Sequence, residues 1–289
     1  MKDLGLMRYY LGIEFIQEAD GYFICQRKYA SEILKRFGMD ESQAVRTSMV
    51  PGHKLCKDEE GKAVCETYFK QVIGSLMYLT ATRPDLMYSV SLISRFMSRP
   101  TEMHMQAAKR IMRYINGTLS YVILYRHDKS HMVGYTDSDY TGDIDDRKST
   151  SGYVFMMSSG AMSWLSKKQP IVTLSTTEAE FVAAAGCASQ VVWLRRITEE
   201  IGCKYTRGIT IYCDNSSTIK LSKNSVMHRS RHIDVRFHFL REKVQDGVIE
   251  MVYCGTKEQI ADVMTKPLSI ELFEKFRAFL GVLPAERVN

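Results

Sequence analysis

The sequence lacks the features that mark membrane-spanning and secreted chains. None of its apolar runs reaches the ~18 residues that a membrane-spanning helix needs. The N-terminal stretch Met1-Lys-Asp-Leu-Gly-Leu has no apolar signal-peptide core, so nothing directs the chain to secretion. The 289 residues are 45% hydrophobic and 25% charged, which is ordinary for globular proteins and fits one or two domains.

Paired cysteines are also missing. The seven cysteines stand far apart in the chain, and none belongs to a Cys-x-x-Cys pair. This spacing argues against a zinc site or a disulfide framework and favours a reducing compartment. We therefore expect the thiols to be buried without forming bonds to one another.

Several catalytic motifs have no counterpart in the sequence. There is no Gly-x-x-x-x-Gly-Lys-Ser/Thr phosphate loop, no Gly-x-Gly-x-x-Gly turn after a strand and no Gly-x-Ser-x-Gly elbow. His228 and His232 have the spacing of a zincin pair, but Arg229 stands where a zincin carries its glutamate. Nucleotide-binding, serine-hydrolase and zinc-protease chemistries are therefore poorly supported.

Positive charge is unevenly spread along the chain. Residues 1–127 hold 18 Lys and Arg against 13 Asp and Glu, whereas residues 128–289 hold 21 against 20. The first part is therefore the better candidate to face a polyanion. An excess of this size is only weak evidence for nucleic acid.

Residues 1–127 are predicted to be mainly helical with one β-hairpin. Strand-like residues over 9–18 and 22–25 flank the turn at Asp20-Gly21. Residues 40–66 contain Pro51-Gly52 and are interpreted as a loop or linker. Helices are expected over 29–37, 69–81, 85–97 and 101–114.

Residues 128–289 alternate between strands and helices. Strands are expected over 132–137, 152–157, 161–165, 208–214 and 248–254, the first three forming an antiparallel meander. Helices are expected over 176–201, 216–222, 233–245, 258–265 and 270–280. This order predicts an α/β fold with a mixed five-stranded sheet and flanking helices.

Two acids stand where apolar strands end. Asp137 ends the strand Met132-Val-Gly-Tyr-Thr-Asp, and Asp214 ends Ile209-Thr-Ile-Tyr-Cys-Asp. If these strands are parallel neighbours, both carboxylates leave the sheet at the same edge. Either acid taken singly is more often a turn cap than a catalytic group. Several acids in apolar surroundings are costly unless a cation lies between them, and we favour a divalent metal.

Two further acids lie on predicted helices. Ser175-Thr-Thr-Glu178 fits a capping box, which gives Glu178 a structural role. Glu180 has no basic partner at i+3 or i+4 and is predicted to be a ligand. Asp262 lies in the first turn of a late helix, where an acid also suits the helix dipole. Most acids of the loop after Asp137 are expected to be solvated, namely Asp143, Asp145 and Asp146. Asp139 is the expected exception.

Several long runs are specific enough to indicate a family. Six lie in the second part: Gly134-Tyr-Thr-Asp-Ser-Asp-Tyr-Thr-Gly, Arg147-Lys-Ser-Thr-Ser-Gly-Tyr-Val-Phe, Leu174-Ser-Thr-Thr-Glu-Ala-Glu-Phe, Tyr212-Cys-Asp-Asn, Arg231-His-Ile-Asp-Val-Arg-Phe-His-Phe-Leu-Arg-Glu and Ala261-Asp-Val-Met-Thr-Lys-Pro-Leu. They resemble the ribonuclease H domain of Ty1/copia-type retrotransposon Pol polyproteins. The first part resembles the segment just upstream, in Lys2-Asp-Leu-Gly-x-x-x-Tyr-Tyr-Leu-Gly-Ile-Glu, Ile73-Gly-Ser-Leu-Met-Tyr-Leu-Thr-x-Thr-Arg-Pro-Asp and Ala107-Ala-Lys-Arg-Ile-x-Arg-Tyr-Ile-x-Gly-Thr.

The resemblance covers nearly the whole chain and implies two domains. Residues 128–289 would form a ribonuclease H-like domain. Residues 1–127 would hold the end of the reverse-transcriptase palm, the thumb and the connection. The family's polymerase strand, Tyr-x-Asp-Asp, has no counterpart here, so we expect no competent polymerase. The chain would be part of a Pol polyprotein or a truncated fragment of one, located in cytoplasmic virus-like particles or in the nucleus.

The same resemblance implies an endonuclease that cleaves the RNA strand of RNA·DNA hybrids with two Mg²⁺ ions, or with Mn²⁺ in their place. The catalytic and metal-binding roles carry over to Asp137, Glu180, Asp214 and Asp262. Contacts to 2′-hydroxyl groups and phosphates are expected from Asn215, Ser216, Arg147, Lys148, Ser149, Arg229, Arg231, Lys109, Arg110 and Arg113. The basic run that contains Arg229 and Arg231 fits a charged outer face equally well. The expected partners are the hybrid and the rest of the Pol polyprotein or reverse transcriptase, with no membrane and no small-molecule cofactor.

Two alternatives stay open at the level of the sequence. The chain could be a catalytically inactive retrotransposon remnant that only binds nucleic acid, and hybrid binding without Mg²⁺-dependent turnover would select this alternative. An integrase-type transposase on the same fold would carry a glutamate on the late helix. Position 262 is Asp, which argues mildly against a transposase.

Overall fold

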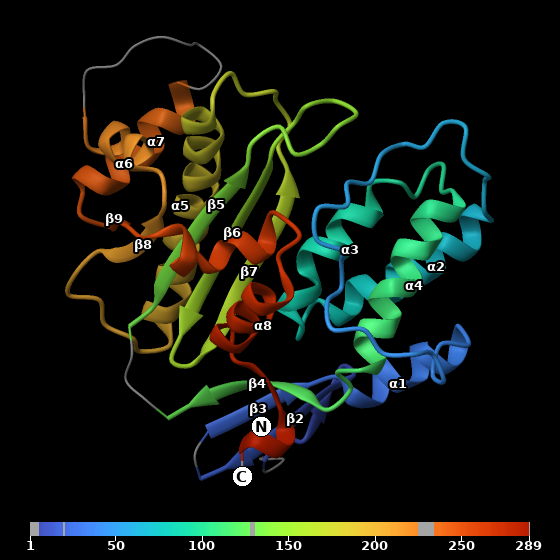
Figure 1. Ribbon diagram of the computed structural model, residues 1–289. Helices are drawn as coiled ribbons and strands as arrows, with labels where there is room; N and C mark the ends of the chain where they lie inside the picture. The colour runs from blue at the N-terminus through green and yellow to red at the C-terminus, as the bar shows by residue number, and fades with distance from the viewer. Residues whose placement is uncertain (1–5, 20, 128–130, 225–233, 289) are drawn as a thin grey trace. The chain divides into compact units, whose positions relative to one another are not determined.

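The computed structural model describes residues 6–19, 21–127, 131–224 and 234–288 (Figure 1). The chain divides into two compact units, each described by itself. Unit 1 comprises Met1–Lys129, Ser158–Ala161 and Pro267–Asn289, and unit 2 comprises Ser130–Met157 and Met162–Lys266. The predicted boundary between residues 127 and 128 divides the chain into two consecutive segments. In the structure, the last 23 residues pack with the N-terminal part instead.

Unit 1 contains an antiparallel sheet in the order β1-β2-β3-β4-β10. Its strands are β1 (Tyr9–Tyr10), β2 (Ile13–Glu18), β3 (Gly21–Cys25), β4 (Tyr121–Arg126) and β10 (Val282–Pro284). Phe23, Cys25, Val122 and Leu124 form a buried apolar cluster on β3 and β4. Gly21 has a positive φ of 156° and lies against the carbonyl of Tyr125, where a Cβ atom would clash.

The predicted hairpin is therefore confirmed as β2 and β3, but it belongs to a larger sheet. β4 and β10 were not predicted. β10 has only three residues, too few for a periodic pattern, and its partner β4 lies far away in the sequence. β10 can be recognised only from its partner, whereas the apolar run of β4, rich in β-branched and aromatic residues, is typical of a strand and was missed.

The helices of unit 1 follow the predicted periodicity. They are α1 (Arg27–Arg36), α2 (Glu66–Leu79), the 3₁₀ turn η1 (Pro84–Leu86), α3 (Met87–Ser94), α4 (Glu102–Asn116), α8 (Ile270–Phe279) and the 3₁₀ turn η4 (Ala285–Val288). Thr101 starts α4, and its backbone N–H donates to Nδ1 of His104 at 2.9 Å. The His104 ring also stacks on Phe96, which secures the first turn of the helix.

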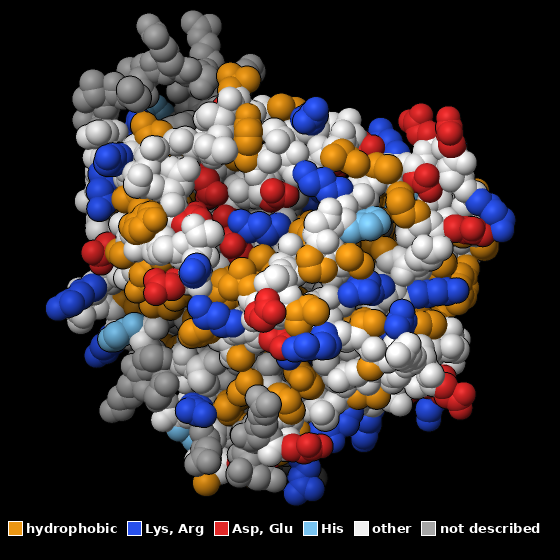
Figure 2. All heavy atoms as spheres, in the orientation of Figure 1, with side chains coloured by type: hydrophobic (Ala, Val, Ile, Leu, Met, Phe, Trp, Pro, Cys, Tyr) orange, Lys and Arg blue, Asp and Glu red, His pale blue; other side chains and the backbone are white. Residues whose placement is uncertain are grey.

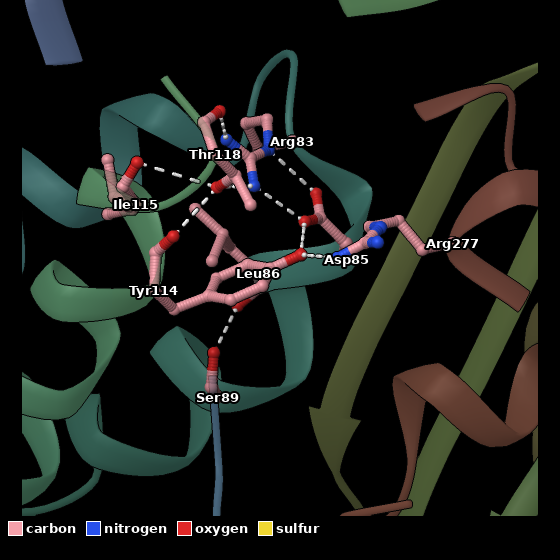
Figure 3. Close-up of polar contacts among 8 residues, drawn as sticks. All are labelled: Arg83, Asp85, Leu86, Ser89, Tyr114, Ile115, Thr118 and Arg277. Atoms are coloured by element: carbon pink, nitrogen blue, oxygen red, sulfur yellow. Dashed lines mark hydrogen bonds and ion pairs between the residues drawn. The ribbon is translucent and has the colours of Figure 1, made fainter. Parts of the chain in front are cut away.

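A buried polar network joins α8 to the earlier helices of unit 1 (Figure 3). Arg83 makes a two-pronged ion pair with Asp85, at 2.9 and 2.7 Å. The Tyr114 hydroxyl donates to Asp85 at 2.6 Å and accepts from Nη1 of Arg277 in α8 at 3.1 Å. Arg83 also donates to Oγ1 of Thr118 at 2.8 Å. Every charged group in the network pairs with an opposite charge or forms a hydrogen bond. These charged side chains can therefore be buried.

Unit 2 contains a mixed sheet in the order β7-β6-β5-β8-β9 (Figure 1). Its strands are β5 (Val133–Asp139), β6 (Thr150–Met157), β7 (Gly160–Lys168), β8 (Ile209–Cys213) and β9 (Ile249–Tyr253). β5 and β6 are antiparallel, whereas β8 is parallel to both β5 and β9. The predicted α/β class with a mixed five-stranded sheet and flanking helices is confirmed.

The helices of unit 2 cover this sheet and supply its core. They are α5 (Thr176–Glu200), α6 (Ser216–Lys223), α7 (Asp234–Gln245) and the 3₁₀ turns η2 (Thr256–Glu258) and η3 (Ile260–Met264). Phe181, Ala184 and Val191 of α5 belong to one buried cluster with Phe155 and Ile211 of the sheet. The predicted helix over 258–265 is instead a pair of 3₁₀ turns.

The start of α5 confirms the predicted cap. Ser175 accepts a hydrogen bond from the Glu178 N–H at 3.1 Å, and the Glu178 carboxylate accepts one from the Leu174 N–H at 2.7 Å. Glu178 is therefore used by the helix terminus.

The cysteines form no disulfides, as expected from their spacing, but not all of them are buried. All seven cysteines are free, and four are buried, whereas Cys65 is exposed. Over the described ranges, no helix combines the length and the apolar content needed to cross a membrane.

Candidate metal centre

The sheet of unit 2 sets Asp137 and Asp214 side by side. In the parallel pair β5–β8, Tyr135 is aligned with Tyr212, and each acid follows two residues later. The two tyrosine rings stack with centroids 4.9 Å apart, which fits this register. Asp137 is only 2% exposed, whereas Asp214 is half-buried just beyond the end of β8.

The turn η3 brings a third acid, Asp262, to the same place. Carboxylate oxygens of Asp137, Asp214 and Asp262 lie within 4.8 Å of one another. Gln259, at the start of η3, donates from Nε2 to the carbonyl of Thr136 at 3.0 Å, and the hydroxyl of Thr265 donates to Oδ2 of Asp137. These two hydrogen bonds hold both ends of η3 against β5.

Gly152 allows this close approach. It stands opposite Asp137 in the β5–β6 pair. A Cβ atom at this position would lie 2.6 Å from Cβ of Met264 and 2.7 Å from Cγ2 of Thr265. The glycine inside the predicted strand was the sequence signal for such an approach, although its meaning is visible only in the structure.

Glu180 enters the site from the second turn of α5. Its side chain is buried, and Oε1 accepts a hydrogen bond from the Ser138 N–H at 3.1 Å. Oε2 is also buried and has no hydrogen-bond partner among the described residues. Ligand atoms of Glu180, Cys213 and Asp214 lie within 4.8 Å of one another, so Asp214 is common to both groups of three.

Burial and mutual repulsion raise the pKa values of the carboxyl groups. Burial, with Asp137 and Asp214 adding to it, raises the pKa of Glu180 well above its usual range. Burial and the nearby Asp137 raise the pKa of Asp262 to about 7, and the same two causes raise the pKa of Asp214. The site therefore concentrates more negative charge than its surroundings compensate.

Lys266 is the cation that the structure places beside these acids, and it was not predicted. Its Nζ atom lies 2.9 Å from Oδ1 of Asp262 and 3.5 Å from Oδ2 of Asp137. Burial lowers the pKa of Lys266, but the two carboxylates outweigh it, so the net pKa is raised. The i, i+4 spacing from Asp262 was the available sequence signal. On the face in Figure 2, acidic side chains gather over unit 2 with basic side chains beside them.

The donor set suits a hard divalent cation. It offers carboxylate oxygens from four residues, one of them the buried Oε2 of Glu180 that lacks a hydrogen-bond partner in the described part of the chain. Burial, followed by repulsion from Glu180, raises the pKa of the Cys213 thiol, which keeps it protonated and disfavours it as a metal ligand. Oxygen ligands of this kind match Mg²⁺ or Mn²⁺ and disfavour zinc.

The loop after β5 differs from the sequence prediction in one acid. Asp143, expected to be solvated, is only 8% exposed. Its Oδ1 accepts from the N–H groups of Asp145 and Asp146, and its Oδ2 pairs with Lys168 at 2.6 Å. Asp143 thus organises the loop. Asp139 is half-buried at the end of β5.

The predicted nucleic-acid contacts of unit 2 differ in how accessible they are. Arg147 and Ser216 are exposed, and Lys148 pairs with Asp146 at 3.5 Å. Ser149 is completely buried and accepts from the Thr141 N–H at 3.1 Å, so its predicted contact is corrected to a role inside the loop. Asn215 is the N-cap of α6 and accepts from the Thr218 N–H at 2.9 Å. Arg229 and Arg231 lie outside the described residues.

The predicted contacts on α4 belong to unit 1. Arg110 donates to Oγ1 of Thr47 at 3.0 Å, and Arg113 donates to the carbonyl of Gln43 at 2.6 Å. Both arginines therefore secure the loop before α2. Lys109 is exposed.

The chain has extensive similarity to transposon polyproteins. It is 39% identical over 284 residues to the retrovirus-related Pol polyprotein from transposon RE1 of Arabidopsis thaliana, covering 98% of this chain and 19% of that protein. It is also 39% identical over 292 residues to the corresponding protein from transposon TNT 1-94 of Nicotiana tabacum, covering 98% of this chain and 22% of that protein. This chain belongs to the Pol polyproteins of Ty1/copia-type retrotransposons. It spans about a fifth of the length of these relatives.

Other comparisons cover parts of this Pol polyprotein chain. A family model described as reverse transcriptase (RNA-dependent DNA polymerase) matches residues 1–51. An uncharacterized mitochondrial protein of Arabidopsis thaliana is 34% identical over 194 residues, covering 67% of this chain and 80% of that protein. The crystal structure of LC11-RNase H1 in complex with an RNA/DNA hybrid superposes with a TM-score of 0.36 at 12% identity, over 47% of this chain and 94% of that one.

Proposed function

We propose that unit 2 is a ribonuclease H that hydrolyses the RNA strand of RNA·DNA hybrids with divalent metal. The observation that carries the proposal is the convergence of Asp137, Asp214 and Asp262 within 4.8 Å at one edge of the sheet. Glu180, whose buried Oε2 has no hydrogen-bond partner among the residues that the structure describes, adds a fourth carboxylate beside them. Membership of the Pol polyproteins agrees with nuclease chemistry in this part of the chain.

The four carboxylates would hold two Mg²⁺ ions, or Mn²⁺ in their place, with Asp137 and Asp214 at the centre of the set. Such ions activate an attacking water molecule and stabilise the leaving oxygen. The protein's own contribution is orientation. The Thr265 hydroxyl fixes Asp137, and the Ser138 N–H fixes Glu180. These contacts hold the ligands in place before the substrate arrives.

The surface beside the site offers groups for the nucleic acid. Arg147 and Ser216 are exposed, and Lys148 and Asn215 are half-buried, near the ends of β5 and β8. We propose that they contact 2′-hydroxyl groups and phosphates of the hybrid, since the 2′-hydroxyl is the group that separates RNA from DNA. Polymerase activity is not proposed, because the chain has no Tyr-x-Asp-Asp strand.

The test is cleavage of a labelled RNA·DNA hybrid by the full chain with and without Mg²⁺. Asp137→Asn and Asp214→Asn should each lower the Mg²⁺-dependent rate by at least about 100-fold, because each removes a charged metal ligand. Glu180→Gln should do the same. Glu200→Gln is its matched control, since Glu200 is exposed on the same helix.

Two results would contradict the proposal. Wild-type rates in the Asp137→Asn or Asp214→Asn chain would refute the assignment of the site. Hybrid binding without any Mg²⁺-dependent cleavage by the wild-type chain would select the non-catalytic remnant. Circular dichroism of each variant separates loss of chemistry from loss of fold.

A further inference from the structure

Lys266 lies where the metal ligands gather, and its two carboxylate partners are among them. Asp137 and Asp262 are almost fully buried, whereas the Lys266 side chain is 33% exposed. The ammonium therefore reaches the buried oxygens from the solvent side. It is the last residue of unit 2, and Pro267 begins the return of the chain to unit 1.

The Lys266 ammonium lies at carboxylate oxygens that a divalent ion would also need. Nζ lies 2.9 Å from Oδ1 of Asp262, within direct ion-pair distance. A metal held by Asp137 and Asp262 would take the same carboxylate oxygens and would repel the lysine. The flexible four-carbon stem and the partial exposure of Lys266 give the ammonium a path into water.

We propose that Lys266 is an internal competitor for the divalent cation held by Asp137 and Asp262. Its ammonium pairs with the two carboxylates and stabilises the acid cluster until metal displaces it. The lysine thereby sets the metal concentration at which the site fills. This inference rests on the proposed metal-dependent nuclease, which supplies the metal for which Lys266 competes.

The geometry also says which binding event Lys266 affects. Its ion pairs are made with Asp137 and Asp262. Glu180 belongs to the other group of possible ligands, with Cys213 and Asp214. Removal of the ammonium should therefore strengthen the binding of a metal ion held by Asp137 and Asp262 more than the binding of a second ion beside Glu180.

The test is calorimetric titration of Mn²⁺ into the full chain, with Lys266→Met and Lys266→Gln compared with the wild type. Both variants should bind one Mn²⁺ ion at least about 10-fold more tightly, because the competing charge is gone. Lys220→Met is the matched control, since Lys220 is an exposed lysine of α6 in the same unit. Its Mn²⁺ affinity should stay within about twofold of wild type.

Thermal unfolding gives a second, independent measurement. In chelator, Lys266→Gln should unfold at a lower temperature than wild type, because the clustered carboxylates lose their counter-ion. At saturating Mn²⁺ this difference should disappear or reverse. An equal loss under both conditions would show a purely structural lysine and overturn the proposal.

The outcomes separate this inference from the proposed function. Equal Mn²⁺ affinity in wild type and both Lys266 variants would overturn competition while leaving the metal site intact. Absence of Mn²⁺ binding in all chains would overturn both. The Gln variant keeps a polar side chain at the position, so a folded protein is available even if the Met variant is unstable.

Discussion

At the scale of single residues, three of the four carboxylates of the site are each held by a different local contact. The Thr265 hydroxyl donates to Asp137, the Ser138 N–H donates to Glu180, and Lys266 pairs with Asp262. The two hydrogen bonds fix the direction of a ligand but cancel little of its charge, whereas Lys266 supplies a single positive charge to the four acids. The orientation of the site is thus built into the protein, and its charge is left for a cation.

The hydroxyl of Thr265 should be needed for metal-dependent chemistry. Thr265→Val removes the donor to Asp137 with little change in volume, and we expect the rate of hybrid cleavage to fall about 10- to 100-fold. Thr265→Ser keeps the hydroxyl and should restore most of the rate. If the valine variant cleaves hybrid as fast as the serine variant, Asp137 does not depend on this contact.

The raised pKa of Asp262 should appear in the stability of the protein in chelator. Its pKa is about 7 in the folded chain, compared with about 3.9 for an unfolded Asp. The folded state therefore binds the proton more tightly, and the stability that this gives is full below about pH 4 and lost as the pH rises to about 7.

Asp262→Asn removes this titration. Between pH 4 and 7, we expect the wild type to lose more free energy of unfolding than the variant, by at most about 4 kcal/mol. Urea denaturation at several pH values in chelator measures the difference. Parallel pH profiles for the two chains would show that Asp262 does not titrate in this range.

The sequence pointed to the acids as candidate ligands because Asp137 and Asp214 end apolar strands and Glu180 has no basic partner on its helix, whereas the role of Asp262 was implied by the family resemblance. It did not identify Lys266 or the buried roles of Ser149 and Asp143. The side chain of a Lys, Ser or Asp in a polar run gives no sign of its burial, which depends on segments that are distant in the sequence. Asp143, for example, is buried by its own loop and by Lys168 at the end of β7.

At the scale of elements, α5 connects the core of unit 2 to its site. The helix carries Glu180 in its second turn, and its first turn is held by the cap at Ser175. Ser175→Ala should lower the free energy of unfolding by about 1 kcal/mol and the melting temperature by about 2–4 °C.

The comparison for this prediction is Ser175→Asp, which retains a side-chain oxygen for the Glu178 N–H and should melt close to wild type. Thermal unfolding followed by circular dichroism distinguishes the two. If the alanine and aspartate variants melt together, the cap makes no contribution to α5.

Elements with a long periodic pattern were predictable, and short ones were not. The 25-residue helix α5 and the strands around the acids matched their predicted ranges within a few residues. The two-residue strand β1 and the three-residue strand β10 exist only through their partners. η3 forms 3₁₀ turns because both of its ends are bonded to β5, which propensity alone does not encode.

At the scale of the whole molecule, the last 23 residues complete the unit that the first residues begin. Arg277 of α8 donates to Tyr114 in the buried network of Figure 3, and Phe276 is completely buried. Val282 of β10 pairs with Ile123 of β4. The N-terminal unit therefore depends on a segment that follows the proposed nuclease in the sequence.

Loss of packing in α8 should destabilise unit 1 selectively. Phe276→Ala should cost about 3–5 kcal/mol through the cavity that it leaves. Hydrogen exchange should then accelerate in η1, α3 and α4, while the protection of β5 and β8 in unit 2 changes little. Equal acceleration throughout the chain would show that the two units unfold together. Phe279→Ala, which alters an exposed side chain of the same helix, is the control.

The central claim is that the acids at 137, 180, 214 and 262 form one divalent-metal site. Anomalous diffraction from crystals of the full chain soaked in Mn²⁺ tests it most directly. We expect manganese peaks within coordination distance of Asp137, Asp214 and Asp262, with the Lys266 ammonium displaced from them. The contradicting result is a crystal soaked at saturating Mn²⁺ in which Lys266 is still paired to Asp137 and Asp262. In such a crystal manganese would be bound elsewhere or not at all.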